Sequence, residues 1–254
     1  MSRRARWSVR LISVAGFILL WDAAASLGIS DPDLFPPFTR VLLRVVELAA
    51  TIEFWARDVW GSLLRLVVAA TLTVPVAVAL GVLTGVSSRV HDVLSPFINF
   101  TLPLPKVAIF PLILAVFGIG DMGKIVLIAI GIFYPLFINV LNSVWRLNAS
   151  SIQDVISIYR IRGVRLWVQV YLRGLVPDIL TGLKTSLGYG FTLVVVSEFT
   201  ASNNGLGNFI WRSWEAYQVL DMYAGVLYLC FFGWAVQSSL DWWLERELSE
   251  SRPA

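Results

Sequence analysis

Three ionisable residues stand in or beside long uncharged runs of this chain, and their types suggest solute binding rather than catalysis. Lys106 lies between Pro105 and Val107, Lys184 lies early in another apolar run, and Glu198 ends that run. A charge at membrane depth is costly and usually faces a bundle interior or a water-filled cavity. A lysine placed there can offer a cation to an anionic solute, and a glutamate can pair with a cation or line a gate.

Each of these residues also has a structural interpretation. A lysine near the end of a span can extend its ammonium group to the membrane surface. Lys184 lies one or two turns from the start of its run, which favours that role. Lys106 can instead pair with Glu198. The sequence leaves these alternatives open.

The sequence offers no constellation for enzyme chemistry. Its one histidine, His91, is expected in a short polar turn next to Asp92, and its one cysteine, Cys230, lies in an apolar run. There is no nucleophile–base pair, no His/Cys spacing for a metal and no phosphate-binding glycine loop. We therefore expect no cofactor and no ATP hydrolysis by this chain. A membrane enzyme or electron carrier would need ligands that the sequence lacks.

The composition indicates an integral membrane protein. Of the 254 residues, 57% are hydrophobic and only 15% are charged, whereas soluble domains carry about 25% charged residues. The net charge of +3 is too small to suggest nucleic acid as a partner. The lipid bilayer is the expected surrounding.

The elements that position these residues are predicted to be apolar helices. A span needs about 20 residues, and the runs predict an all-α, polytopic fold with about six crossings in a single transmembrane domain, 1–254. The basic start, residues 2–10, places the N-terminus in the cytoplasm, and six crossings return the C-terminus there. Asp22 and the later spans favour a retained first helix over a signal peptide. The expected spans are 10–28, 59–86, 93–118, 124–146, 178–199 and 220–241.

Two interruptions of this pattern are informative. Pro103, Pro105 and Pro111 predict that the third span is broken, which is tolerated at membrane depth only inside protein or beside a water-filled cavity. After the first span, Thr39 is a candidate cap for an amphipathic surface helix over residues 40–52.

A basic segment, 150–176, separates the fourth and fifth spans. It carries four arginines within a helix-compatible stretch, at positions 160, 162, 165 and 173. Charge alone fits an ordinary cytoplasmic loop that obeys the positive-inside rule. A docking segment for a cytoplasmic partner is the other interpretation.

Several stretches resemble the membrane-spanning permease subunits of bacterial ABC importers, in the nitrate, sulfonate, taurine and bicarbonate branch. They cover nearly the whole chain: LFPPFTRVL (34–42), SLLRLVVA (62–69), LPLPKVAIFPLILAVFGIGDMGKI (102–125), GLVPDILTGLKTSLGYGFTLVVVSEF (174–199) and SNNGLGNFI (202–210).

The resemblance implies a type I ABC importer permease fold in the bacterial inner membrane. It implies a path for a small, anionic solute that an extracytoplasmic binding protein delivers. ATP would be bound and hydrolysed by separate ATPase subunits, and a second permease subunit would complete a homodimer or heterodimer. Lys106, Pro105 and Glu198 are the residues expected along the path. A thiamine-precursor or pyrimidine importer, or a non-transporting membrane scaffold, is the alternative.

The family's docking loop has a Glu-Ala-Ala start, a later Gly and a Leu-Pro, and this chain departs from it. Counted back from Pro177, Asp154 matches the Glu and Arg160 matches the Gly, while Leu172 and Arg173 stand at Leu-Pro. The resemblance implies two short helices on the ATPase subunit. The expected coupling residues are Asp154, Val155, Ile156, Arg160, Arg162, Gly163, Arg165, Leu172 and Pro177.

Overall fold

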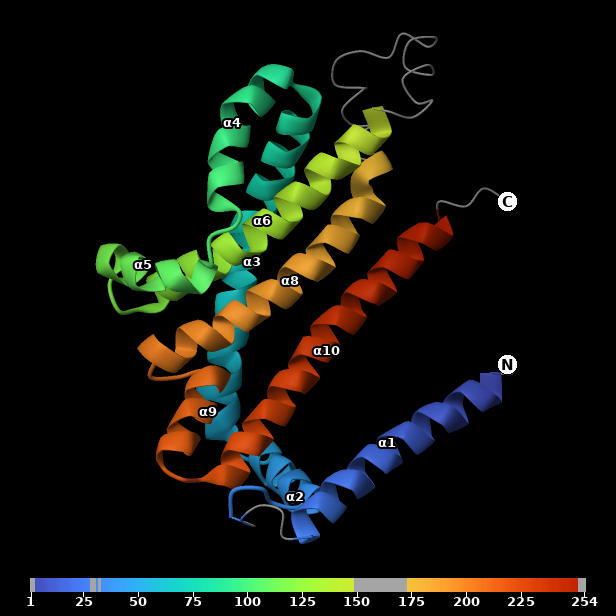
Figure 1. Ribbon diagram of the computed structural model, residues 1–254, viewed down its shortest axis with the longest axis vertical. Coiled ribbons are helices and arrows are strands. Elements are labelled where there is room, and N and C mark those ends of the chain that lie inside the picture. Colours follow the sequence, from blue (N-terminus) through green and yellow to red (C-terminus); the bar gives the residue numbers. More distant parts are fainter. Residues whose placement is uncertain (1–2, 28–30, 32, 149–172, 251–254) are drawn as a thin grey trace. The chain divides into compact units, whose positions relative to one another are not determined.

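The computed structural model describes residues 3–27, 31, 33–148 and 173–250, and this part of the chain is helical and contains no strand (Figure 1). The long helices correspond to the uncharged runs of the sequence. The elements are α1 (Arg3–Ser26), α2 (Phe38–Ala49), the π-helical turn η1 (Phe54–Val59), α3 (Trp60–Val86), α4 (Ser88–Thr101), the 3₁₀ turn η2 (Lys106–Ile109), α5 (Phe110–Phe117), α6 (Asp121–Asn148), α8 (Arg173–Ala201), α9 (Leu206–Glu215) and α10 (Val219–Glu250).

Four of these helices are long and apolar enough to cross a membrane. They cover Phe54–Val86, Asp121–Asn148, Gly174–Thr200 and Val219–Arg246. The helices on either side of the 102–105 break are apolar enough together to form a broken span or a re-entrant loop, and Ile12–Ser26 is a shorter apolar helix. The expected all-α, polytopic fold is therefore confirmed, while the count of six crossings stays a prediction.

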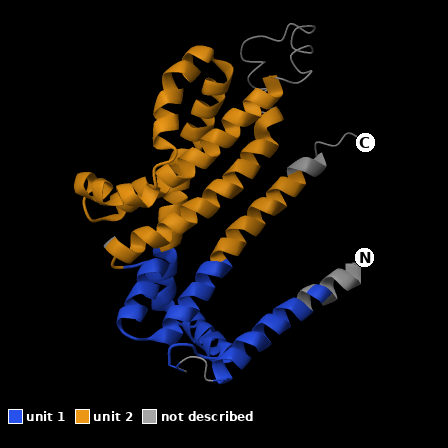
Figure 2. Cartoon of the chain, viewed as in Figure 1, with its two compact units in different colours: residues 1–61, 204–231 blue, residues 62–203, 232–254 orange. Residues whose placement is uncertain are grey.

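The described chain divides into two compact units (Figure 2). One contains residues 1–61 and 204–231, and the other contains residues 62–203 and 232–254. We describe them as units 1 and 2.

The core of unit 2 forms where α6 packs against α8. Glycines allow the close approach: a Cβ added at Gly131 would overlap the side chain of Leu193, and one at Gly190 would come within 2.6 Å of Ile132. Leu127, Ile132 and Leu193 are almost fully buried between these helices and α3. Small residues at such contacts let helices associate in lipid, where no hydrophobic force brings them together.

The third predicted span is broken, as its prolines indicate. The axis bends by 90° between Ser88–Thr101 and Lys106–Phe117. Pro105 precedes η2, and Pro111 stands at the start of α5, where a missing N–H costs nothing. Gly118 then ends α5 with a φ of 81°, a conformation that favours glycine.

Unit 1 is held by contacts between α1, α2 and the start of α10. A carboxylate oxygen of Asp22 accepts a hydrogen bond of 2.6 Å from the backbone N–H of Phe38. This bond satisfies the first backbone N–H of α2, which begins at Phe38. The predicted start at Arg40, with Thr39 as its cap, is therefore wrong, and the side chain at the helix start comes from α1. Arg44 binds the carboxylate of Asp221 through two guanidinium nitrogens.

Candidate functional site

Lys106 binds the backbone at the bend between α4 and η2, residues 101–106, which we call the corner. Its side chain is buried, with 6% of its surface exposed. The ammonium group donates hydrogen bonds to the backbone carbonyls of Thr101 at 2.7 Å, Leu102 at 3.0 Å and Leu104 at 3.0 Å. The first two carbonyls lie at the end of α4, where a helix leaves acceptors without internal partners, and the third lies in the turn that follows. Lys106 therefore satisfies the backbone that the prolines free.

Tyr134 of α6 holds the same corner from a second side. The Lys106 nitrogen lies 4.1 Å from the centroid of the Tyr134 ring, a cation–π contact. The Tyr134 hydroxyl donates to the Thr101 hydroxyl oxygen at 2.7 Å. The corner is thus bound to α6 by a cation–π contact and a hydrogen bond.

Two hollows adjoin this corner in unit 2. One is a cleft of about 380 Å³, and polar residues of η2, α6 and α8 contribute to its lining: Lys106, Tyr134, Asn139, Asn142 and Tyr189. The other is a groove of about 390 Å³ that shares Lys106 and Tyr134 but is otherwise lined mainly by apolar side chains of α3 and α6. The cleft is the more polar of the two and the better candidate for a small polar solute.

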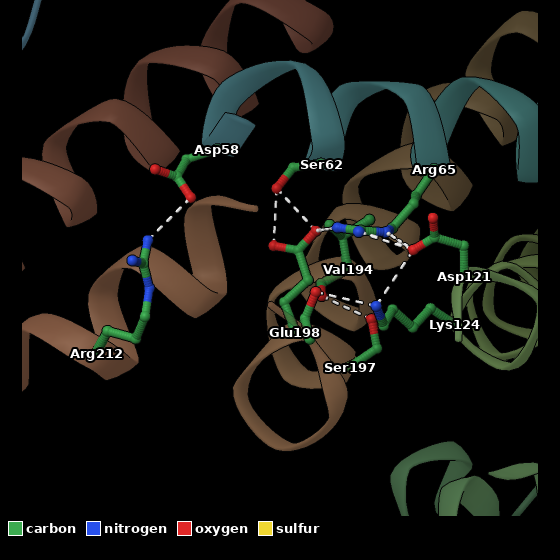
Figure 3. A network of polar contacts seen from close by, with 10 residues as sticks. Asp58, Ser62, Arg65, Asp121, Lys124, Val194, Ser197, Glu198 and Arg212 are labelled. Carbon is green, nitrogen blue, oxygen red and sulfur yellow. Dashed lines mark hydrogen bonds and ion pairs between the residues drawn. The ribbon is translucent and has the colours of Figure 1, made fainter. Parts of the chain in front are cut away.

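A buried group of charges joins α3 to α8 elsewhere in unit 2 (Figure 3). Glu198 is fully buried, and its carboxylate accepts a hydrogen bond of 2.6 Å from Arg65. The Ser62 hydroxyl lies 2.8 and 2.7 Å from the two carboxylate oxygens. Burying a charge is tolerated when it is paired and hydrogen-bonded, and Glu198 meets both conditions.

The start of α6 extends this group. Asp121 accepts a hydrogen bond of 2.8 Å from the Nε of Arg65, and Lys124 lies 3.2 Å from the same carboxylate oxygen. The Lys124 ammonium group also lies 3.0 Å from the hydroxyl of Ser202. Two cations and two anions therefore balance at this end of α3, α6 and α8. We call Ser62, Arg65, Asp121, Lys124, Glu198 and Ser202 the charge cluster.

Comparison with known proteins decides the family. The family described as "binding-protein-dependent transport system inner membrane component" matches residues 74–246. The chain belongs to this family. It is a multi-pass transport permease of the inner membrane.

Individual permeases are similar over most of their length. The taurine transport system permease protein TauC of Escherichia coli is 29% identical over 94% of this chain and 91% of its own. The bicarbonate transport system permease protein CmpB of Synechococcus elongatus is 24% identical over 94% and 89%. The nitrate import permease protein NrtB of Leptolyngbya laminosa is 27% identical over 71% and 63%.

The predicted path residues of the permease lie in two different groups. Lys106 binds main-chain carbonyls rather than Glu198, and Pro105 shapes the turn before it. Glu198 pairs with Arg65 in the charge cluster. A role of all three along a solute path stays a prediction. Lys184, expected to reach the membrane surface, lies 2.6 Å from Asp241 of α10.

Most predicted coupling residues of the permease lie outside the described residues: Asp154, Val155, Ile156, Arg160, Arg162, Gly163, Arg165 and Leu172. Pro177 is described and lies inside α8. The coupling role of the segment stays a prediction. Within the described ranges, no group of three or more His, Cys, Asp or Glu residues is placed to hold a metal.

Sequence reasoning missed Arg65, Asp121 and Lys124, although a signal for them was available. Arg65 stands near the start of the second predicted span, Asp121 and Lys124 stand at the start of the fourth, and Glu198 ends the fifth. Successive spans alternate in direction, so all four positions fall at the same face of a membrane. Opposite charges gathered at one face can pair.

Proposed function

We propose that this permease carries a small, anionic solute of the taurine, sulfonate, bicarbonate or nitrate type across the inner membrane, driven by ATP. The observation that supports this most directly is its similarity to TauC, which extends over 94% of the chain and 91% of the relative. CmpB and NrtB, named for bicarbonate and nitrate, are similar over long stretches as well.

The remaining parts of the transporter are proposed from the family. An extracytoplasmic binding protein delivers the solute, and a second permease subunit, identical or related, completes the path. ATP is bound by separate ATPase subunits, because this chain has no phosphate-binding glycine loop. The permease itself needs no cofactor. Its work is conformational, coupling closure of the ATPase subunits to alternating access.

The direct test is uptake into proteoliposomes that contain the permease with its ATPase, supplied with the binding protein and ATP. Labelled taurine, an aliphatic sulfonate, bicarbonate and nitrate are offered in turn, with a thiamine-precursor pyrimidine as the comparison. We expect ATP-dependent accumulation of one of the four anionic or zwitterionic solutes. Uptake of the pyrimidine alone would move the permease to the alternative substrate class, and uptake of none would favour a scaffold.

The basic segment is proposed as the contact with the ATPase. Arginines at 160 and 162, with Asp154 near its start, offer charge complementarity, which sets docking register more than affinity. Changing both arginines to glutamate should release the ATPase. The measurement is co-purification in detergent together with uptake. Wild-type co-purification and transport by the double variant would make this segment an ordinary positive-inside loop.

We propose that both termini face the cytoplasm. The arginines of residues 2–10 and the even number of expected crossings support this orientation. Single cysteines introduced at positions 2, 121 and 249, with Cys230 changed to serine, can be labelled by a membrane-impermeant reagent. Position 121 should react from outside in intact cells, and positions 2 and 249 only after the membrane is opened.

A further inference from the structure

The polar cleft of unit 2 carries one charged side chain among its described lining residues, and that side chain has no hydrogen left to offer. An ammonium group has three N–H donors. Those of Lys106 are accounted for by the carbonyls of Thr101, Leu102 and Leu104. A solute in the cleft therefore cannot form a hydrogen bond with Lys106 unless the corner first opens.

The charge of Lys106 nevertheless acts on the cleft. Its partners are backbone carbonyls and an aromatic ring, and no carboxylate of the described residues forms an ion pair with it. A positive charge at low dielectric acts over several ångströms. Lys106 thus favours an anion in the cleft through its potential, without contact.

Neutral groups supply the hydrogen bonds that Lys106 cannot. Asn142 and Tyr189 have exposed side chains that line the cleft and form no hydrogen bond within the described part of the chain. The side-chain oxygen of Asn139 is buried and has no partner among the described residues. It lies close to Gly182 of α8, where an added Cβ would come within 2.9 Å of it. Buried polar atoms without partners are rare, and this one belongs to a residue that lines the same cleft.

We propose that this cleft is a solute subsite that binds an oxyanion through neutral donors, with Asn142 and Tyr189 making the contacts and Lys106 setting the potential. The amide N–H of Asn142 and the hydroxyl of Tyr189 donate to the oxyanion. The oxygen of Asn139 is buried against α8, so it accepts a second, hydrogen-donating group only when α6 and α8 separate, and a solute that carries both an oxyanion and a donor then uses the subsite fully. This assignment rests on the proposed function and deepens it.

The test compares uptake by complexes that contain single variants of the permease. Taurine is the first probe, because it carries an oxyanion and a donor, and nitrate, which lacks the donor, is the second. Asn142→Ala and Tyr189→Phe each remove one donor. Asn142→Asp replaces the amide group with a negatively charged carboxylate of similar size. Tyr217→Phe is the matched control, since Tyr217 is 82% exposed and does not line the cleft. All variants are first checked for co-purification with the ATPase.

We expect Asn142→Ala and Tyr189→Phe each to lower the maximal uptake rate about tenfold, the effect of one lost hydrogen bond to a charged group. Asn142→Asp should lower it further, by about a hundredfold, through repulsion, and Tyr217→Phe should not change it. Asn139→Leu should reduce taurine uptake more than nitrate uptake.

A second measurement separates a binding role from a structural one. In a Cys230→Ser background, Asn142→Cys should react with a charged thiol reagent more slowly when the transported probe is added. Wild-type uptake by both Asn142→Asp and Tyr189→Phe, or labelling that the transported probe does not slow, would overturn the subsite. Absence of uptake by the wild-type complex for every probe would instead overturn the proposed function, and the subsite with it.

Discussion

Replacing Lys106 with methionine separates its structural role from a role in solute contact. Methionine keeps most of the volume of the side chain and removes the three donors. Each hydrogen bond from a charged group contributes about 1.5–3 kcal/mol. Water from the adjoining cleft can recover part of that loss, and the cost of burying an ammonium group disappears. We therefore expect a net destabilisation of about 2–4 kcal/mol.

The assay is thermal unfolding of the purified permease in detergent. For a chain of this size, about 1 kcal/mol corresponds to about 2–4 °C in Tm, so the Lys106→Met variant should unfold about 5–10 °C below the wild type. Lys184→Met is the matched control. Lys184 pairs with Asp241 in a partly exposed bridge of 2.6 Å, and such pairs contribute about 0–1 kcal/mol.

The difference in Tm between the two variants tests whether Lys106 stabilises the corner. If Lys106→Met unfolds at the wild-type temperature but loses uptake of anionic probes, the charge of Lys106 serves the solute and its bonds to the carbonyls are incidental to stability. If both variants lose the same small amount of stability, the corner does not depend on Lys106.

Two further predictions concern packing and buried charge in unit 2. Glu198→Ala should destabilise the permease by about 2–4 kcal/mol, because it leaves a cavity and removes one of the two carboxylates that bind Arg65, while Asp121 still pairs with it. Glu198→Gln should cost less, since Ser62 can still donate to it, and equal Tm values for the two variants would argue against this reason. Gly131→Ala should lower the free energy of unfolding by about 1–3 kcal/mol, because the new methyl group overlaps Leu193. Gly16→Ala is the control: no atom lies within 4 Å of the added Cβ, so the Tm should be unchanged or slightly higher. Both comparisons use the same thermal assay, and a Gly131→Ala variant as stable as wild type would mean that α8 yields easily at this contact.

The broken span shows how far the sequence could predict the fold. Proline removes a backbone donor wherever it stands in a helix, so the break near Pro103, Pro105 and Pro111 follows from residue types alone. The 90° bend does not. It depends on Lys106 folding back onto carbonyls of its own segment and on the ring of Tyr134, which is supplied by another helix.

The charge cluster marks a second limit. Arg65 and Glu198 are 133 residues apart in the chain. Their charges and their places near span ends are readable, but pairing depends on how α3, α6 and α8 pack, which glycines such as Gly131 and Gly190 determine. Local patterns indicate that a buried charge needs a partner without naming it. The cleft could not be predicted from the sequence for the same reason, because Asn142 and Tyr189 lie on different helices.

The way Lys106 binds its corner has a consequence for which neighbouring residues can be exchanged. All three of its acceptors are main-chain carbonyls, and every amino acid has one. Side chains at 102 and 104 can therefore change without removing an acceptor, whereas position 101 must also keep a hydroxyl group for Tyr134. Residues 102 and 104 can therefore be exchanged while Lys106 keeps its acceptors and the bend between α4 and η2 stays the same.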